Sequence, residues 1–240
     1  MNNVFITDLN ASGFIEQAEV TGIPRPVCAW IKGMYGAAKS CGVDAIVAVS
    51  DGDCSHTRSL LEILKHEGME VIPFAYPYDR DAGILKAHIE KFAKRLGATF
   101  ARANEWMANL DRIRRKLAHI DSLTWKENRV TGFENHLLLV SSSDFDGNPD
   151  AFEERCDKFI EQAEKRDELP QKIRLAFIGV PPIFPDIYHF FEERGARVVF
   201  NEVQRQFSFP YAGGDIVERY LKYTYPYDVA GRIDDIKREI

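Results

Sequence analysis

The fold is decided by the stretch Val43-Asp44-Ala45-Ile46-Val47-Ala48-Val49-Ser50-Asp51-Gly52-Asp53-Cys54-Ser55-His56. Apart from Asp44, its first seven residues are β-branched or small and apolar, which is typical of a strand buried on both faces of a parallel sheet. The strand ends at the turn Asp51-Gly52-Asp53, and a helix is expected to begin near Ser55. Ligands and catalytic groups collect at the carboxyl edge of open α/β sheets, so Cys54 is the first candidate for a functional residue.

The segments on either side complete a βαβ unit. Apolar residues recur at helical spacing from Ala29 to Ser40, and Gly42 follows as the expected stop. A second helix is expected over 55–67 and a second strand over 69–74. The two strands should lie side by side and parallel. Cys28 directly precedes the first of these helices and is the second candidate.

The rest of the chain predicts a second α/β half. Residues 1–25 form an entry segment with one short apolar run, and residues 80–120 and 150–166 carry long amphipathic helical patterns. Buried-type strands are expected over 173–178 and 196–200, with helices over 184–194, 213–222 and 228–239. We therefore expect an α/β fold with a first lobe at 1–79, a helical insertion and linker at 80–170, and a second lobe from 171 to 240. With two strands, this second lobe looks incomplete, and its last portion is expected beyond Ile240 or on another polypeptide.

Composition excludes some classes of protein. The chain has 240 residues, of which 45% are hydrophobic, and its formal net charge of -6 argues against a general nucleic-acid surface. No apolar run approaches the roughly 20 residues of a membrane helix, and the start Met1-Asn2-Asn3-Val4 lacks an export signal, so a cytoplasmic protein is expected. Four scattered cysteines do not form a secreted disulfide framework.

The cysteines separate into two pairs by their positions. Cys28 and Cys54 each precede a helix, where backbone amides favour the thiolate form that binds iron; the alternative is that both are small buried apolar residues. Cys41 at a helix end and Cys156 on an amphipathic face are expected to be packing residues. Zinc is disfavoured because no short Cys or His spacing occurs.

Three other residues have both a functional and a structural interpretation. His56 either polarises a ligand or acts as an acid, or it is an exposed residue of a first helical turn. Glu202 follows a strand and either projects into a crevice or caps the loop. Asp53, with Asp51, suggests a metal site, although Asp-Gly-Asp before a helix more often forms a turn with an N-cap. No Gly-rich phosphate loop, Ser-His-Asp order or HExxH motif supports a nucleotide hydrolase or a simple hydrolase.

Several motifs together resemble those of a known family. They are Arg25-Pro26-Val27-Cys28, Val43-Asp44-Ala45-Ile46-Val47, Asp53-Cys54, Gly179-Val180-Pro181, residues 195–202 (Gly-Ala-Arg-Val-Val-Phe-Asn-Glu) and residues 225–232 (Tyr-Pro-Tyr-Asp-Val-Ala-Gly-Arg). This order is similar to that of the cluster-bearing subunits of the 2-hydroxyacyl-CoA dehydratase and benzoyl-CoA reductase family, in particular the D-component of 2-hydroxyglutaryl-CoA dehydratase. The resemblance covers nearly the whole chain.

The resemblance implies two flavodoxin-like α/β lobes and a [4Fe-4S] cluster held by three cysteines, with the fourth iron open to water or substrate. Cys28 and Cys54 match the first two ligands. The third family cysteine would lie beyond Ile240, and neither Cys41 nor Cys156 stands in its context. An iron with an open position can act as a Lewis acid and as an electron donor, and the surrounding residues tune the reduction potential of the cluster.

The resemblance also implies a reaction and its partners. An ATP-dependent iron–sulfur activator protein would deliver one electron to the cluster, which would pass it to an acyl-CoA thioester, and the ketyl radical would expel a hydroxyl group. Asp53, His56 and Glu202 would surround the cluster. A homologous second subunit or a second copy of this chain is the expected partner. The alternatives are a family reductase acting on an aromatic acyl-CoA or another small substrate, and a cluster-less α/β partner subunit.

Overall fold

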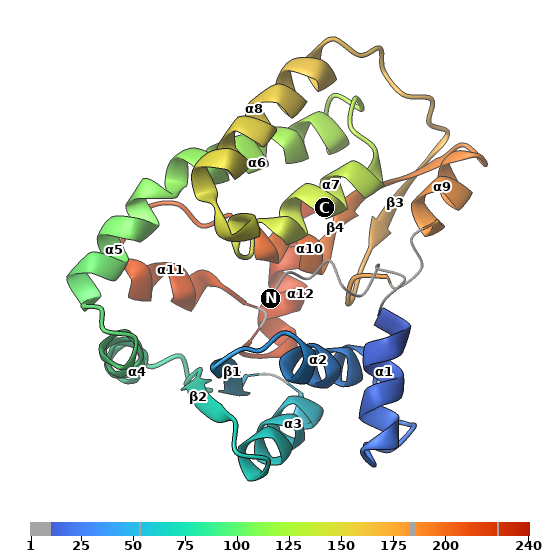
Figure 1. Ribbon diagram of the computed structural model, residues 1–240. Coiled ribbons are helices and arrows are strands. Elements are labelled where there is room, and N and C mark those ends of the chain that lie inside the picture. The colour runs from blue at the N-terminus through green and yellow to red at the C-terminus, as the bar shows by residue number, and fades with distance from the viewer. Residues whose placement is uncertain (1–10, 53, 183–185, 225) are drawn as a thin grey trace. The chain divides into compact units, whose positions relative to one another are not determined.

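The computed structural model describes residues 11–52, 54–182, 186–224 and 226–240 (Figure 1). The chain divides into two compact units. Of the described residues, those within 11–103 and 215–233 form the first unit, and those within 104–214 and 234–240 form the second. Helices α5 (Phe100–Asn109) and α12 (Val229–Glu239) carry residues of both units.

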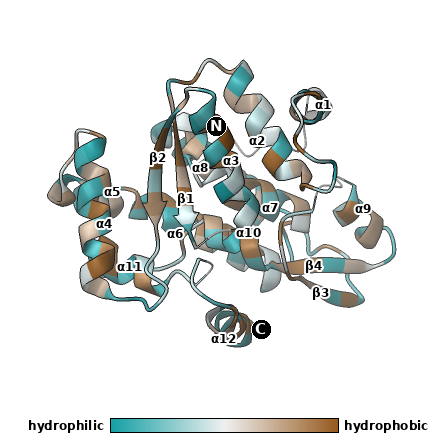
Figure 2. Ribbon diagram, turned by 90° about the horizontal axis from the view of Figure 1, so that it is seen from below, coloured by the Kyte–Doolittle hydropathy of each residue, from teal (hydrophilic) through white to brown (hydrophobic). Residues whose placement is uncertain are grey.

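The first unit is built around one βαβ motif. Its elements are α1 (Ala11–Val20), α2 (Ala29–Ser40), β1 (Ala45–Asp51), α3 (Ser55–His66), β2 (Glu70–Ala75), α4 (Ala82–Arg95) and α11 (Ile216–Lys222). Strands β1 and β2 are parallel, with a register irregularity between Val49 and Asp51. Figure 2 shows the two strands side by side. The predicted strand–helix–strand unit is therefore confirmed.

The two faces of this sheet are covered unequally. Ile46 of β1 and Val71 of β2 pack into a cluster with apolar residues of α1, α2 and α3. Phe74 lies on the opposite face, in a cluster with residues of α4 and α11. Val47 also belongs to this second face, and its side chain is 51% exposed. The expectation of a strand buried on both faces is wrong, because the second face is covered only near the carboxyl end.

The second unit combines a helical layer with a second parallel strand pair. It contains α6 (Asp111–Trp125), α7 (Gly132–Ser141), the short 3-10 helix η2 (Phe145–Gly147), α8 (Pro149–Glu164), β3 (Ile173–Phe177), α9 (Ile187–Glu192), β4 (Ala196–Asn201) and α10 (Glu202–Phe207). Strands β3 and β4 are parallel, which agrees with the expected α/β fold. Ile173 is 55% exposed, so β3 is not the buried strand that its apolar sequence predicts.

The core of the second unit is helical. Side chains of α6, α7 and α8 form a continuous buried cluster around Ile113, Leu117 and Phe152. A capping box at Thr131 fixes the start of α7, because the Thr131 side chain accepts from the Glu134 amide while Glu134 accepts from the Thr131 amide. The sequence did not predict α1, α7 and α10.

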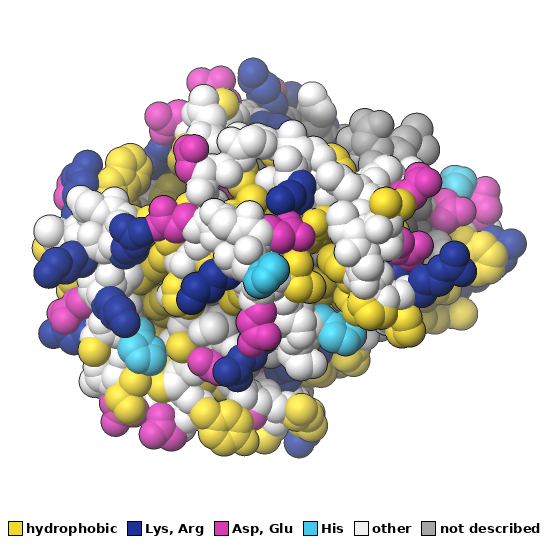
Figure 3. Space-filling model, turned by 60° about the horizontal axis from the view of Figure 1, so that its bottom comes forward, with side chains coloured by type: hydrophobic (Ala, Val, Ile, Leu, Met, Phe, Trp, Pro, Cys, Tyr) yellow, Lys and Arg dark blue, Asp and Glu magenta, His cyan; other side chains and the backbone are white. Residues whose placement is uncertain are grey.

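The surface mixes charges and apolar groups. On the face shown in Figure 3, acidic and basic side chains are interspersed, with hydrophobic side chains between them. Within the described ranges, no helix is long and apolar enough to span a bilayer.

Candidate functional site

Cys28 and Cys54 occupy equivalent positions in the first unit. Cys28 is the N-cap residue of α2 and Cys54 that of α3, both with extended backbone (φ -62°, ψ 152° and φ -73°, ψ 158°). Neither side chain caps its own helix, and both thiols are exposed. The sequence correctly predicted that each cysteine precedes a helix, but not that both are exposed rather than buried.

Contacts join the carboxyl-terminal half of α2 to the carboxyl end of α3. Lys39, near the end of α2, forms a 2.9 Å ion pair with Glu67, the C-cap residue of α3. The Tyr35 hydroxyl of α2 donates to the same carboxylate at 2.9 Å. Cys28 and Cys54 lie at the opposite, amino ends of these two helices.

The other two cysteines lie elsewhere. Cys41 is the C-cap residue of α2, so the helix places it roughly 20 Å from Cys28. It is exposed, and the expectation that it packs in a core is wrong, because its side chain leaves the helix end toward solvent. Cys156 is fully buried in the helical core of the second unit, as predicted, and burial raises the pKa of its thiol to about 11.

The remaining predicted site residues are divided between the units. Asp53 lies outside the described residues. His56 is exposed in the first turn of α3, in the first unit. Glu202 is buried in the second unit, where its Oε2 accepts a 2.8 Å hydrogen bond from the Gly179 amide. Glu202 follows β4 and Gly179 follows β3, so this bond joins the carboxyl ends of the two strands, as the loop-capping interpretation expects.

A cavity of about 470 Å³ lies beside the turn that leads to Cys54. It is lined by Asp51, Gly52, Tyr76, Tyr78, Pro226, Tyr227, Asp228, Val229 and Arg232. Gly52 has φ +101°, and a Cβ there would lie 2.7 Å from the Pro226 carbonyl oxygen. Only glycine fits this close approach. Because Gly52 is two residues before Cys54, the cavity opens within about 7 Å of the cysteine backbone.

Two copies of the tetrapeptide Tyr-Pro-Tyr-Asp, at 76–79 and 225–228, supply most of this cavity. The sequence analysis missed this repeat, although the identical letters were a visible signal. The Tyr76 ring lies 5.6 Å from that of Tyr227. Burial raises the pKa of Tyr76 well above its usual range and that of Tyr227 to about 12, so both phenols stay protonated at neutral pH.

Arg80 joins the two tetrapeptide segments. Its guanidinium forms a 3.3 Å ion pair with Asp228 and lies 4.9 Å from the centre of the Tyr227 ring. Arg80 itself has φ +57°, a left-handed conformation that a non-glycine residue rarely adopts. Such strain persists where surrounding contacts hold it, and it recurs at functional sites.

The second unit holds a buried polar network that the sequence did not indicate. Tyr188 Oη lies 2.8 Å from His136 Nδ1 and donates to Asn201 Oδ1 at 2.9 Å. All three side chains are buried. Burial lowers the pKa of His136 to about 4, so the imidazole is neutral at pH 7.

The two exposed thiols at the starts of α2 and α3 have the right chemistry for iron. Thiolates are soft ligands that bind iron–sulfur clusters. No group of three or more His, Cys, Asp or Glu side chains suited to a metal ion is found within the part of the chain that the structure describes. The residues present therefore fit two protein ligands of a cluster.

Comparison with known proteins gives the family. No curated protein matches the chain. The family model described as 2-hydroxyglutaryl-CoA dehydratase, D-component, matches residues 3–240 and thus covers both units. With nearly every residue inside the match, the chain belongs to the family of 2-hydroxyglutaryl-CoA dehydratase D-components.

Proposed function

We propose that this chain is an iron–sulfur subunit of a 2-hydroxyacyl-CoA dehydratase-like enzyme, with Cys28 and Cys54 as two ligands of a [4Fe-4S] cluster. The observation that supports this most strongly is that both exposed thiols stand at the amino ends of helices whose carboxyl-terminal halves are in contact. We propose that the two thiols meet at one edge of the sheet. The amino end of a helix stabilises negative charge, and the thiolates that hold an iron–sulfur cluster are negatively charged. Family membership supports the dehydratase-like role.

The third cluster ligand is not one of this chain's other cysteines. Cys41 is at the opposite end of α2, and Cys156 is enclosed in the helical core of the second unit. We propose that the ligand comes from sequence outside these 240 residues or from a partner chain. Proposed partners are a homologous second subunit or a second copy of this chain, and an ATP-dependent iron–sulfur activator protein.

The cavity beside Cys54 is the proposed place for the acyl end of the CoA thioester. When bound, the cluster would supply single electrons to the substrate. The chain's own residues would enclose and orient the substrate. The rings of Tyr76 and Tyr227 provide an apolar wall, and Arg80 holds the Tyr227 segment against the turn. The protonated phenols can donate hydrogen bonds to a carbonyl or hydroxyl oxygen of the substrate. His56 and Asp53 remain proposed neighbours of the cluster, and Glu202 a proposed site residue of the second unit.

A cluster-less partner subunit is the second candidate, because two of the four cysteines are positioned away from Cys28 and Cys54. One experiment distinguishes the cluster-bearing subunit from the cluster-less one. The chain is reconstituted anaerobically with iron, sulfide and a small thiol, and its iron and acid-labile sulfide are then counted. We expect iron and sulfide in equal amounts in the wild type and in the matched control Cys41→Ser, and background values in Cys28→Ser and Cys54→Ser. Background iron in the wild type would support the cluster-less subunit.

Binding of a 2-hydroxyacyl-CoA rather than an aromatic acyl-CoA separates the dehydratase from the reductase.

A further inference from the structure

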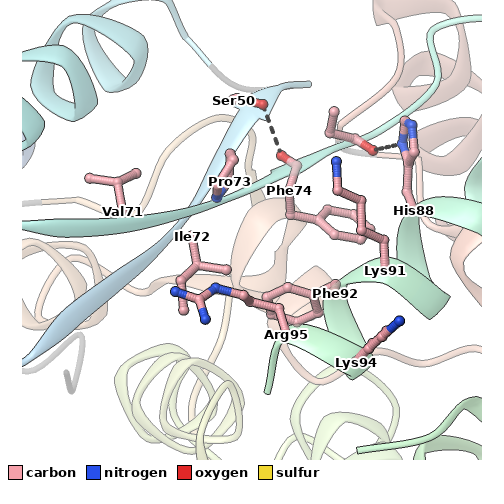
Figure 4. A pocket seen from close by; sticks show the side chains of 11 residues that line it. Ser50, Val71, Ile72, Pro73, Phe74, His88, Lys91, Phe92, Lys94 and Arg95 are labelled. Carbon is pink, nitrogen blue, oxygen red and sulfur yellow. Dashed lines mark hydrogen bonds between the residues drawn. The ribbon is translucent and has the colours of Figure 1, made fainter. Parts of the chain in front are cut away.

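A larger cavity in the first unit contains none of the residues proposed above. It has a volume of about 630 Å³ and lies between β2 and the second half of α4 (Figure 4). This volume falls within the range of small-molecule sites, roughly 300–1,000 Å³. The cavity is lined by Ser50, Val71, Ile72, Pro73, Phe74, Ala75, His88, Lys91, Phe92, Lys94 and Arg95.

One wall of this cavity is apolar and contains two aromatic rings. Phe74 of β2 and Phe92 of α4 lie edge to face, with ring centroids 5.6 Å apart. Both rings are only partly buried, so part of each is open toward the cavity. Ile72 and Pro73 extend the apolar surface along β2. A flat aromatic ligand would stack or pack against such a wall.

Helix α4 also brings basic side chains to this cavity. Lys91, Lys94 and Arg95 are spaced i, i+3 and i+4 on α4, which places them on neighbouring positions of the helix. Figure 4 shows the Lys91 side chain rising toward Phe74 and the Arg95 side chain reaching toward Ile72. None of the described residues that line the cavity is acidic.

These charges are only partly balanced. Arg95 forms an ion pair with Glu70, at the start of β2. Among the described residues, neither Lys91 nor Lys94 has a carboxylate partner. Three positive charges and one negative charge leave a local excess of two positive charges. His88 Nδ1 bonds the Ala75 carbonyl oxygen at 2.8 Å, which anchors the helix to the end of β2.

We propose that this cavity binds a nucleotide, with its base against Phe74 and Phe92 and its phosphates on the lysines of α4. A phosphate monoester carries about -1.5 to -2 charges at neutral pH, which matches the local excess, whereas a single carboxylate would leave one lysine uncompensated. The chain has no Gly-rich phosphate loop, so side chains supply the phosphate contacts. None of the residues that line this cavity lines the cavity beside Cys54 or is a proposed cluster ligand. If the nucleotide is the head group of coenzyme A, the site deepens the proposed function and rests on it.

Isothermal titration of the full chain with ADP tests the proposal. We expect saturable binding that weakens about tenfold or more in Lys91→Glu, since charge-assisted contacts to phosphate are lost. Lys86→Glu is the matched control, because Lys86 is an exposed residue of the same helix that does not line the cavity. It should bind ADP like the wild type. Phe92→Leu, which keeps the side chain apolar, should weaken binding by removing the ring.

The ligand series identifies the source of the nucleotide. Tighter binding of adenosine 3′,5′-bisphosphate than of ADP would assign the site to the head group of coenzyme A, and the reverse order would assign it to a free nucleoside diphosphate. Inorganic phosphate binding as tightly as ADP would overturn the proposal, as would unchanged affinity in Lys91→Glu or no binding of either nucleotide at millimolar concentration. Iron content in Lys91→Glu should equal that of the wild type, so this test and the cluster test fail independently.

Discussion

The sequence placed individual residues well where local chemistry determines their position. Cys28 and Cys54 precede helices because the turns before them end one element and the helical periodicity begins directly after them. Cys41 shows the limit of this reasoning. Its place before Gly42 predicted a helix end correctly, but periodicity does not say whether a C-cap side chain faces the core or solvent, and Cys41 is exposed.

This difference gives a stability prediction for two cysteines. Cys156→Ala should lower the free energy of unfolding by ~1 kcal/mol or somewhat more, because it leaves a small cavity in a fully buried cluster. Cys41→Ala should change it by less than ~0.5 kcal/mol, because the side chain is exposed. Urea denaturation of both variants measures the two values. Equal losses in both variants would contradict the assigned environments.

The buried His136 predicts a pH dependence of stability. Its pKa is about 4 in the folded chain against 6.5 for an ordinary histidine, so the unfolded state takes up a proton first as the pH falls. The folded state should therefore lose up to ~3 kcal/mol relative to the unfolded state between pH 6.5 and 4, and nothing further from this group below pH 4.

Urea denaturation of the wild type, His136→Gln and the control His189→Gln at several pH values measures this effect. His189 is mostly exposed on α9 of the same unit, so its variant should keep the wild-type slope. His136→Gln should have a flatter profile. An identical slope in all three proteins would show that His136 is not the titrating group.

At the scale of elements, the sequence predicted the strand–helix–strand motifs but missed contributions that depend on packing. The apolar run in β1 indicated burial on both faces, yet Val47 is half exposed. The sequence of one strand does not determine how many other elements cover the sheet. Helix α1 was missed for a related reason. Among its residues whose burial is described, Ala18 is the one fully buried apolar residue, and the helix is held by close packing on α2.

Gly36 of α2 allows this packing of α1. A Cβ at Gly36 would lie 2.5 Å from the Phe14 carbonyl oxygen, a backbone atom that cannot move without shifting α1. Gly36→Ala should therefore destabilise the first unit by ~1–3 kcal/mol, the usual cost of overpacking. Gly13→Ala in α1 is the matched control, because nothing lies near its added methyl group.

Gly13→Ala should be neutral or stabilising by up to ~1 kcal/mol, since alanine favours a helix more than glycine does. Thermal denaturation followed by circular dichroism compares the two variants. A Gly36→Ala variant as stable as Gly13→Ala would mean that α1 does not pack on α2 as described.

At the scale of the whole molecule, sequence motifs spread from residue 25 to 232 indicated the family, and the family match over residues 3–240 confirms it. The cavity beside Cys54 was not foreseen, since its lining residues come from 51–78 and from 226–232, which are far apart in the sequence and meet only in the folded unit. The two matching tetrapeptides were visible, but their proximity depends on α11 packing beside α4.

The central claim is that this chain supplies two protein ligands of a [4Fe-4S] cluster, Cys28 and Cys54, while a third comes from elsewhere. The most direct test is anaerobic reconstitution in excess small thiol, which can occupy the missing ligand position, followed by gel filtration without that thiol and iron counting. We expect about four irons per chain before gel filtration and loss of most of the iron after it, because two thiolates hold the cluster weakly. A cluster that stays complete after the small thiol is removed, or one that forms equally in Cys28→Ser and Cys54→Ser, would contradict the account.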